Sequence, residues 1–362
     1  MNIIKKLFGT KEKDNKSYDH FWTWFQKKEK DFYNVVYENR DIEKNFFNKL
    51  STKLDEIHKE LFYMTGMYDE KTVELVITAD GAVKNIVFVE ELIASAPEII
   101  GWKFSALKPP LNIMDVNIDM DGYQFTPEKL KFYSKDNINY PDEISIVVTH
   151  NELNEDNRTT VTNGTFIFLD NLLGELTLVS SLDCVQVICE SDAEQELIPI
   201  NKLKDYLVWR QKEFIEKYEG SRHNTLNDTY SVLEAKLENG NPLVAVINRD
   251  LLEWDRKASH PWILQIDIVY NGQENNGLPD LGTRLLLDKI ENQIMTNLKD
   301  FDGFLNIGRQ TAENKREIYF ACKDFRKPSK VLNEFQNLNP NILYLTFEIY
   351  KDKYWKSFNR FS

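Results

Sequence analysis

The sequence predicts an α+β protein, and three observations lead to this class. Apolar residues recur at helical spacing in the N-terminal segment, alternate with a period of two in later segments, and switch between the two periods in the last third. The 362 residues exceed one typical core, which indicates two or three domains. Hydrophobic residues make up 42% of the chain, which is ample for packed interiors.

The sequence of residues 1–66 predicts a charged leader followed by a helical hairpin. One apolar stripe at helical spacing contains Phe25 and Phe32, and a second stripe runs from residue 42 to residue 61. We expect Gly66 to end the second helix. An aromatic ligand cage is the alternative for this segment, but stripes at helical spacing usually form a core.

Residues 67–199 predict a central α+β domain. The stretch from residue 72 to residue 91 alternates as a β-hairpin does, with Asp80-Gly81 as its turn. Short strands mixed with helices are typical of the α+β class. Further strands are expected near residues 114–120, 143–150, 165–169 and 184–190, and a helix near residues 127–133.

Residues 200–226 predict a connecting helix and a linker. Leu203, Leu207 and Phe214 lie on one side of the expected helix. The stretch "EGSRHNTLND" that follows is rich in turn formers and poor in apolar residues, which is typical of a linker.

Residues 227–362 predict a ferredoxin-like domain with an added β-hairpin. The hairpin is "YSVLEAKLENGNPLVAVINRD", and after it the order is strand, helix, strand, strand, helix, strand. That order is the split βαβ arrangement. Right-handed crossovers put both helices on one face of the sheet. The whole chain is therefore expected to contain an N-terminal helical hairpin, a central α+β domain and this C-terminal domain.

A hairpin at residues 305–322 carries the candidate site. With its turn at residues 312–315, alternation places Arg309 and Arg316 on the face that points at the helices. Two guanidinium groups there predict either a bidentate site for a carboxylate or phosphate, or ion pairs with acidic helix residues such as Glu291. The apolar residues expected on the same face are Leu305, Ile307, Ile318 and Phe320.

The opposite face of this sheet is expected to be free of helices and open to a protein partner or a second copy of the chain. Its outward residues include Glu317, Tyr319 and Tyr344. Tyrosine suits such contacts because it provides a large contact area at a low entropic cost.

The last third also resembles a known bacterial family of uncharacterised proteins, the domain of unknown function 695. The resemblance rests on the order of "NGLPD", "LLLDKIENQI", "IGRQTAENKREIYF" and "YKDKYW". The family is sometimes linked with a regulator-of-ribonuclease-E-inhibitor type domain, which implies a binding protein and not an enzyme. The resemblance supplies no catalytic residues.

Composition excludes several functional classes. The formal net charge of −13 argues against a general nucleic-acid binder and against docking on anionic lipid. No stretch approaches the roughly 18 consecutive apolar residues of a membrane-spanning helix. Cys184, Cys189 and Cys322 are too few for a disulfide framework, so we expect a reducing cytoplasm.

The segment "NIDMDGYQFTPE" resembles a calcium-binding EF-hand loop. Asn117, Asp119, Asp121 and Glu128 have the spacing of its ligands. Alternation before the loop predicts a strand instead of the entering helix that the motif requires, so we interpret the segment as a strand and an Asp-Gly turn. No other metal motif and no glycine-rich nucleotide loop occurs, so no cofactor is predicted.

These observations favour an acidic, multi-domain cytoplasmic protein with a non-catalytic binding or regulatory role of the adaptor type. The alternative is an enzyme or receptor with an anion-binding cleft between the two α+β domains, where Arg309 and Arg316 would hold the ligand. A homo-oligomeric structural module is a third hypothesis.

Overall fold

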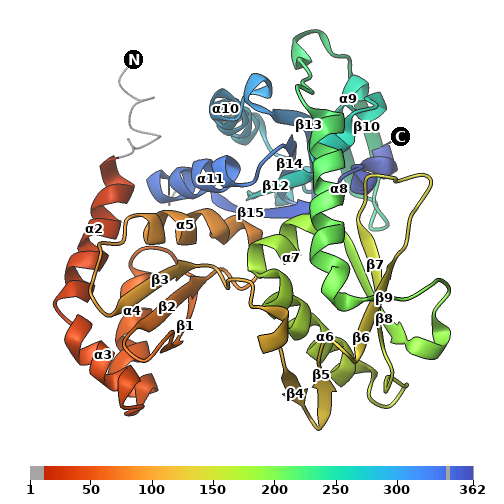
Figure 1. Ribbon diagram of the computed structural model, residues 1–362. Helices are drawn as coiled ribbons and strands as arrows, with labels where there is room; N and C mark the ends of the chain where they lie inside the picture. The colour runs from red at the N-terminus through yellow and green to blue at the C-terminus, as the bar shows by residue number, and fades with distance from the viewer. Residues whose placement is uncertain (1–11, 340–342, 362) are drawn as a thin grey trace. The chain divides into compact units, whose positions relative to one another are not determined.

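The computed structural model describes residues 12–339 and 343–361, and the chain divides into two compact units (Figure 1). One unit is Lys11–Glu216, and the other contains Lys217–Ser362. Both units combine helices with small sheets, which confirms the α+β class. The expected leader begins with residues 1–11, which lie outside the described residues.

The first unit begins with helices that pack on a three-stranded sheet. Strand β2 (Val73–Thr78) pairs antiparallel with β1 (Phe62–Met67) and parallel with β3 (Trp102–Ala106). Phe25 contacts Trp102 and Phe104 of β3 edge-on, which explains the aromatic stripe as core. The helices are α2 (Glu12–Gln26), α3 (Glu29–Tyr37), the π-helix η1 (Glu43–Phe47) and α4 (Asn48–Asp55).

Two predictions for this region were wrong. The second helix ends at Asp55, and Gly66 lies inside strand β1 instead of capping a helix. The predicted hairpin after Asp80-Gly81 contains a helix, α5 (Ile86–Ala94), where its second strand was expected. Since β2 and β3 run parallel, the chain needs a crossover between them, and an apolar run buried on most sides shows no helical alternation of polarity.

The rest of the first unit surrounds a sheet with the strand order β8-β7-β6-β9. Strands β7 (Ser145–His150) and β8 (Cys184–Cys189) are parallel and agree with the predicted strands. The predicted strand at residues 165–169 lies within a long helix, and the predicted helix at residues 127–133 overlaps a strand. The remaining elements are β4 (Ile118–Met120), β5 (Tyr123–Phe125), β6 (Leu130–Ser134), α6 (Arg158–Leu173), α7 (Glu175–Ser181), β9 (Ile198–Pro199) and α8 (Leu203–Tyr218).

The first unit also contains the EF-hand-like segment and the expected connecting helix. The EF-hand-like segment is the β4–β5 hairpin, whose turn residues Asp121 and Gly122 have positive φ angles of 53° and 84°. Helix α8 contributes Leu203 and Leu207 to the core of the four-stranded sheet. The expected connecting helix therefore packs in the first unit.

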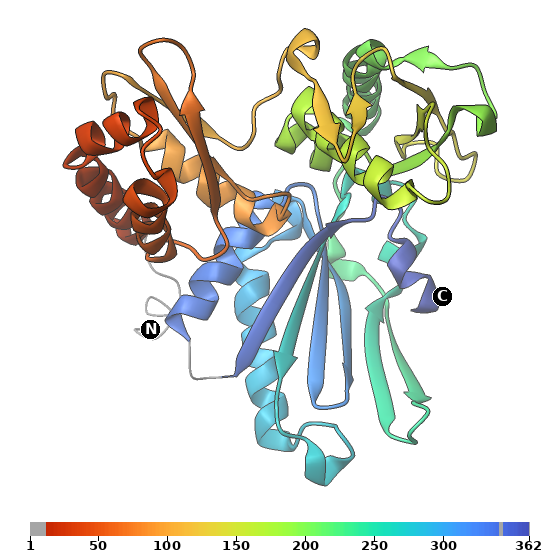
Figure 2. The same cartoon turned by 90° about the horizontal axis from the view of Figure 1, so that it is seen from below.

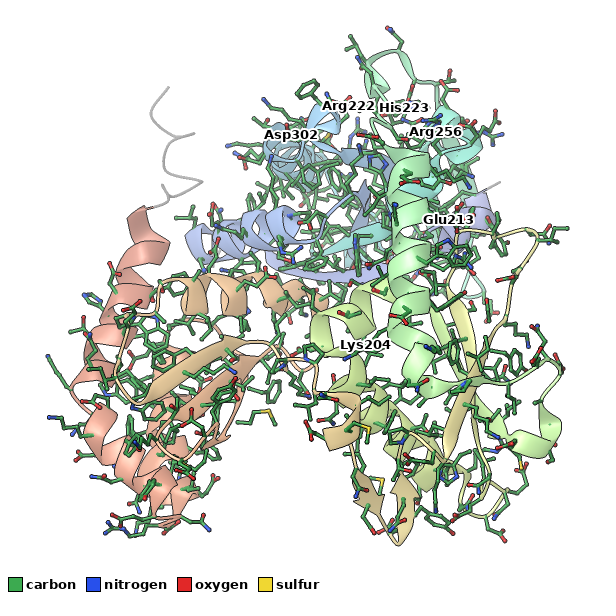
Figure 3. All side chains as sticks on the ribbon, in the orientation of Figure 1. Lys204, Glu213, Arg222, His223, Arg256 and Asp302 are labelled. Carbon is green, nitrogen blue, oxygen red and sulfur yellow. The ribbon has the colours of Figure 1, made fainter. Side chains whose placement is uncertain are left out.

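The expected linker is bound tightly to the second unit. The side chain of Lys323 donates to the carbonyl of Ser221, and Thr225 donates its backbone N–H to Asp300 at 3.0 Å. His223 lies 2.8 Å from a carboxylate oxygen of Asp228. Figure 3 shows Arg222, His223 and Arg256 at the same end of this unit. Turn-forming composition indicated the absence of regular structure here, but these contacts show that the segment is anchored.

The second unit contains a six-stranded antiparallel sheet with the order β10-β11-β13-β14-β12-β15. Its last four strands and two helices have the order and pairing of a split βαβ domain, and the β10–β11 hairpin extends the sheet on one side (Figure 2). The elements are β10 (Tyr230–Lys236), β11 (Pro242–Asn248), α9 (Arg249–Glu253), β12 (Trp262–Val269), α10 (Leu281–Asn297), β13 (Phe304–Ala312), β14 (Lys315–Cys322), α11 (Arg326–Leu338), β15 (Tyr344–Lys351) and the 3-10 helix η10 (Lys356–Phe361).

The β13–β14 pairing follows the predicted register near the turn and departs from it farther away. Arg309 pairs with Ile318, but a β-bulge between Asn306 and Gly308 shifts the register by one residue. Leu305 and Ile307 consequently point away from the two long helices, which corrects the expectation that they face them.

The sheet face opposite α10 and α11 carries a second core, so the expectation of a free face was wrong. Tyr319 is only 1% exposed, and its ring meets Phe358 of η10 edge-on. Arg360 of the same 3-10 helix donates to the Tyr319 hydroxyl at 2.9 Å. The buried members of this core are Ala245, Ile247, Leu251, Ile263, Leu305, Ile307, Tyr319, Ala321, Trp355, Phe358 and Phe361.

Candidate functional site

Three arginines line a pocket of about 400 Å³ in the second unit. Every lining residue belongs to this unit, so the pocket differs from the predicted interdomain cleft. Its size falls within the range of small-molecule sites. We call it the arginine pocket, and it is lined by Val232, Val244, Val246, Leu278, Pro279, Arg284, Asp288, Arg309, Thr311 and Arg316.

Strand alternation and helical spacing bring the charged residues together. Thr311 pairs with Arg316 across the β13–β14 ladder, and Arg309 is two residues from Thr311, so all three side chains share one face. On α10, Arg284, Asp288 and the more deeply placed Glu291 are separated by four and three residues, which puts them on one side of the helix. The helix therefore presents two acids to two strand arginines.

Both strand arginines are paired with acids of α10. Arg309 donates from Nη1 to the two carboxylate oxygens of Glu291 at 3.1 and 3.0 Å. Arg316 donates from Nη1 to Asp288 at 2.7 Å and from Nε to the Thr311 hydroxyl at 3.3 Å. The predicted partnership of the arginines with Glu291 is present, and Asp288 is an additional partner that we had not predicted.

Burial makes this network sensitive to loss of any member. Arg316 and Glu291 are each 4% exposed. Burial raises the pKa of the Glu291 carboxyl above its ordinary value, although the charges of Arg309 and Arg316 oppose that rise. A buried carboxylate beside two guanidinium groups fixes the position of both, because losing it would leave buried positive charge uncompensated.

The pocket retains donors that its own acids do not use. Within the described part of the chain, the Arg284 side chain has no hydrogen bond or ion pair, and Nη2 of both Arg309 and Arg316 donates to no protein atom. Val232, Val244 and Val246 form an apolar floor beside these groups. The arrangement can hold an anionic group by charge-assisted hydrogen bonds while an apolar group covers the valines.

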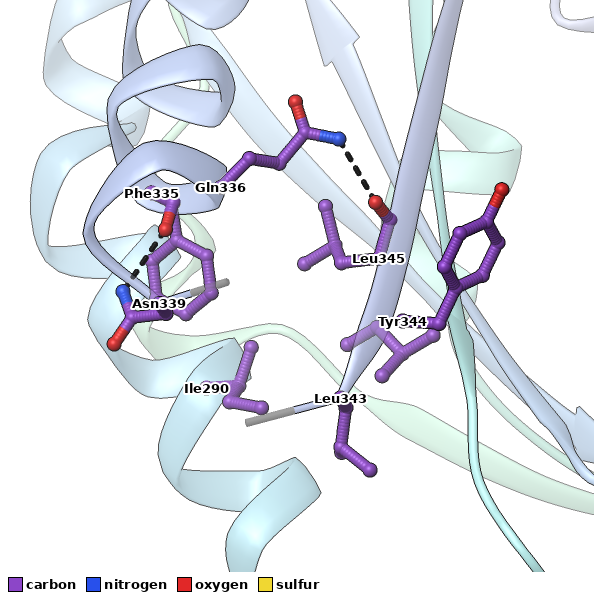
Figure 4. A pocket seen from close by; sticks show the side chains of 8 residues that line it. Ile290, Phe335, Gln336, Asn339, Leu343, Tyr344 and Leu345 are labelled. Carbon is purple, nitrogen blue, oxygen red and sulfur yellow. Dashed lines mark hydrogen bonds between the residues drawn. The ribbon is translucent and has the colours of Figure 1, made fainter. Parts of the chain in front are cut away.

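The two predicted tyrosines lie elsewhere. Tyr319 belongs to the second core and offers no contact surface. Tyr344 is 70% exposed at the start of β15. It adjoins a smaller hollow of about 160 Å³ between α10, α11 and β15, and its ring projects from the opposite side of the strand from Phe335 (Figure 4). The two tyrosines therefore form no joint surface with the arginines.

Sequence reasoning missed Arg284, Asp288 and the valine floor. The spacing of the two charged residues relative to Glu291 on a predicted helix was a usable signal, since residues three and four apart share a face. The floor comes from β10 and β11, and only the long-range pairing of β11 with β13 brings it beside the arginines. Local sequence patterns do not encode such pairing.

A family model described as "Family of unknown function (DUF695)" matches residues 233–361, which confirms the resemblance of the C-terminal third. Every lining residue of the arginine pocket except Val232 falls within the matched range. No curated protein and no solved structure shows significant similarity to the chain.

No helix in residues 12–339 or 343–361 has the length and apolarity needed to cross a membrane. Over the same ranges, no group of three or more His, Cys, Asp or Glu side chains could hold a metal ion.

Proposed function

We propose that the second unit is a non-catalytic binding module that holds an anionic group in the arginine pocket. The observation that carries this proposal is the presence of unused guanidinium donors next to an exposed apolar floor. Arg284 is the main unpaired cation of the pocket among the described residues. A solvated surface arginine needs no ligand, but here it faces two further guanidinium groups that the fold already holds in place.

Charge supports an anion over a cation as the bound group. The pocket network contains three guanidinium groups and the two carboxylates of Asp288 and Glu291, so its formal charge is positive by one. The whole chain has a net charge of −13. A local positive site on an acidic protein would bind its ligand through short-range contacts, since long-range attraction is screened at physiological salt.

The geometry also indicates the ligand class. Guanidinium groups recognise carboxylates and phosphates in a bidentate manner, and the valine floor favours an apolar body attached to that head. We therefore propose an amphipathic anion as the ligand of the pocket. The proposal includes a reducing cellular compartment, because all three cysteines are free thiols.

Calorimetric titration with hexanoate and with inorganic phosphate tests this function. We expect hexanoate to bind the full chain more tightly than phosphate, and to raise its melting temperature. The Arg284→Gln variant should lose this binding and keep its fold, because the side chain is exposed and unpaired. Lys289→Gln is the matched control, since it removes the same charge from an exposed position of α10 outside the pocket. Equal affinities in both variants, or no binding by the wild type, would contradict the proposal.

A further inference from the structure

Strand β10 leaves one edge of the six-stranded sheet open. It is the terminal strand of the sheet and pairs only with β11 among the described strands. The Thr229 carbonyl accepts from the N–H of Arg249 at 2.8 Å, and the N–H of Leu237 donates to Asn241 at 2.9 Å. Since hydrogen-bonded pairs alternate along an antiparallel ladder, the odd-numbered residues of β10 bond to β11. The even-numbered residues, including Val232 and Glu234, direct their N–H and C=O groups to the open edge.

The first half of this edge lacks the protection that exposed strands usually have. Natural edge strands are guarded by charges, prolines, bulges or short length. The β10–β11 pairing is continuous over seven residues without a register shift. The charged residues Glu234 and Lys236 occupy the second half of β10, whereas the stretch from Tyr230 to Leu233 carries no charge. Val232, in that uncharged stretch, is 64% exposed.

The open edge adjoins the arginine pocket through Val232. Its side chain forms part of the pocket floor, and its backbone groups point to the edge. In a strand added beside β10, the residue opposite Val232 would direct its side chain to the same face of the sheet, and therefore toward the pocket. The next residue would direct its side chain to the opposite face, beside Leu233.

We infer that the ligand of the pocket is an extended peptide segment of a partner protein that adds as a seventh strand along β10. This inference rests on the proposed anion-binding function and names the partner chemistry. The segment carries one acidic residue opposite Val232, whose side chain extends toward Arg284, and apolar residues on its other face, whose side chains lie along Leu233. Glu234 shares the pocket face, so the position opposite it is neutral or basic. Backbone pairing contributes affinity, and the guanidinium groups select the acidic residue.

Two variants of Glu234 test whether the peptide adds as a strand along β10. Glu234→Pro removes an N–H that points to the open edge, where proline is tolerated because the bonds to β11 remain. Glu234→Gln is its matched control, since it removes the same charge and keeps the N–H. The probe is a capped peptide of about eight residues with one central glutamate, serine at its other positions on the glutamate's face and valine on the opposite face, labelled for fluorescence anisotropy. The same peptide with lysine in place of the glutamate controls for charge.

The expected result separates strand addition from simple anion binding. The wild type and Glu234→Gln should bind the acidic peptide, while Glu234→Pro should bind it at least about tenfold more weakly, as the loss of one or two hydrogen bonds implies. Hexanoate should bind all three proteins equally. If Glu234→Pro retains full peptide affinity, the strand-addition inference is overturned while the anion pocket stands; if neither peptide nor hexanoate binds the wild type, the proposed function itself fails.

Two further measurements keep the inference testable if Glu234→Pro does not fold. Hydrogen exchange of the wild type should slow at the amides of Val232 and Glu234 when the acidic peptide is added, and unchanged exchange there would overturn the inference. Sedimentation without peptide should show no association that depends on β10. A dimer of the wild type that shows protected β10 amides in the absence of peptide would identify a second copy of the chain as the occupant and overturn the peptide partner.

Discussion

Arg309 donates from one nitrogen, Nη1, to both carboxylate oxygens of Glu291, at 3.1 and 3.0 Å. A carboxylate oxygen of Glu291 also lies 3.7 Å from Nη1 of Arg316 on the neighbouring strand. One buried acid of α10 thus compensates guanidinium groups from both β13 and β14. This polar layer stands between helix and sheet where the apolar core ends, and it positions the donors of the arginine pocket.

Replacing Glu291 should destabilise the second unit strongly. Glu291→Leu removes the carboxylate and leaves the buried guanidinium group of Arg316 and the partly exposed one of Arg309 under-compensated, so we expect a loss of about 3–5 kcal/mol in the free energy of unfolding. Urea denaturation followed by circular dichroism measures the loss. The double variant Glu291→Leu with Arg309→Met removes both charges and should recover part of that stability. A double variant as unstable as the single one would show that the ion pair is not the source of the effect.

A second prediction concerns the β-bulge. Gly308 has a φ of 142°, and a Cβ atom built on it would lie 2.2 Å from the carbonyl oxygen of Val246. Gly308→Ala must therefore push β13 away from β11, and we expect a loss of about 3 kcal/mol or more in the free energy of unfolding, the upper end for overpacked sites. Gly282→Ala is the control, because its nearest contact would be at 3.6 Å in an exposed helix, and it should be neutral or stabilising by about 0.5–1 kcal/mol. Equal unfolding midpoints for the two variants would contradict the assigned role of the bulge.

The second unit was the most predictable part of the chain because its local sequence patterns agree with its tertiary structure. The strand Trp262–Val269 alternates apolar and polar residues from Leu264 to Ile268, and the turn at Glu313-Asn314 has the positive φ angles of a tight hairpin, 50° and 63°. The pairing of Thr311 with Arg316 follows directly from that turn. The bulge at Gly308 was missed because a single glycine in a strand also fits several other structures.

The first unit was less predictable because tertiary contacts override propensity there. The β-branched run in Ile86–Ala94 favours a strand locally, but the parallel pairing of β2 and β3 requires a crossover, and the run forms the helix within it. In the second unit, the free sheet face was expected from the split βαβ arrangement alone. The last residues of the chain cover it, and nothing in the alternation of Tyr319 distinguishes a solvent-facing side chain from one covered by Phe358.

The covering of that face gives a third prediction. Phe358 is 1% exposed and fills the second core, so Phe358→Ala should cost about 3–5 kcal/mol in the free energy of unfolding through the lost burial and the cavity left behind. Arg360→Gln should cost only about 1 kcal/mol, since it chiefly removes the hydrogen bond to Tyr319. Chemical denaturation of both variants measures the two losses in the free energy of unfolding. If Phe358→Ala is no less stable than Arg360→Gln, the 3-10 helix η10 is not part of the core.

The last prediction concerns His260, which is fully buried. Its Nδ1 lies 2.8 Å from the Ser259 hydroxyl, and the Trp254 ring lies beside it, with a centroid distance of 5.3 Å. Burial, with smaller contributions from the charges of Lys323 and the nearby His223, lowers the pKa of His260 from 6.5 to about 3. The folded protein therefore keeps this imidazole neutral over a pH range in which the unfolded chain protonates it.

Stability should consequently fall on acidification in a defined window. Between pH 6.5 and about 3, the unfolded chain binds a proton that the folded chain does not, so the free energy of unfolding should decrease by up to about 1.4 kcal/mol for each unit of falling pH. His260→Gln should be less stable than the wild type at neutral pH and should lose this part of the pH dependence, whereas replacing the exposed His20 by glutamine should leave the slope unchanged. Urea titrations across the window measure all three proteins. A slope that is the same in the wild type and in His260→Gln would mean that the buried imidazole does not contribute to acid sensitivity.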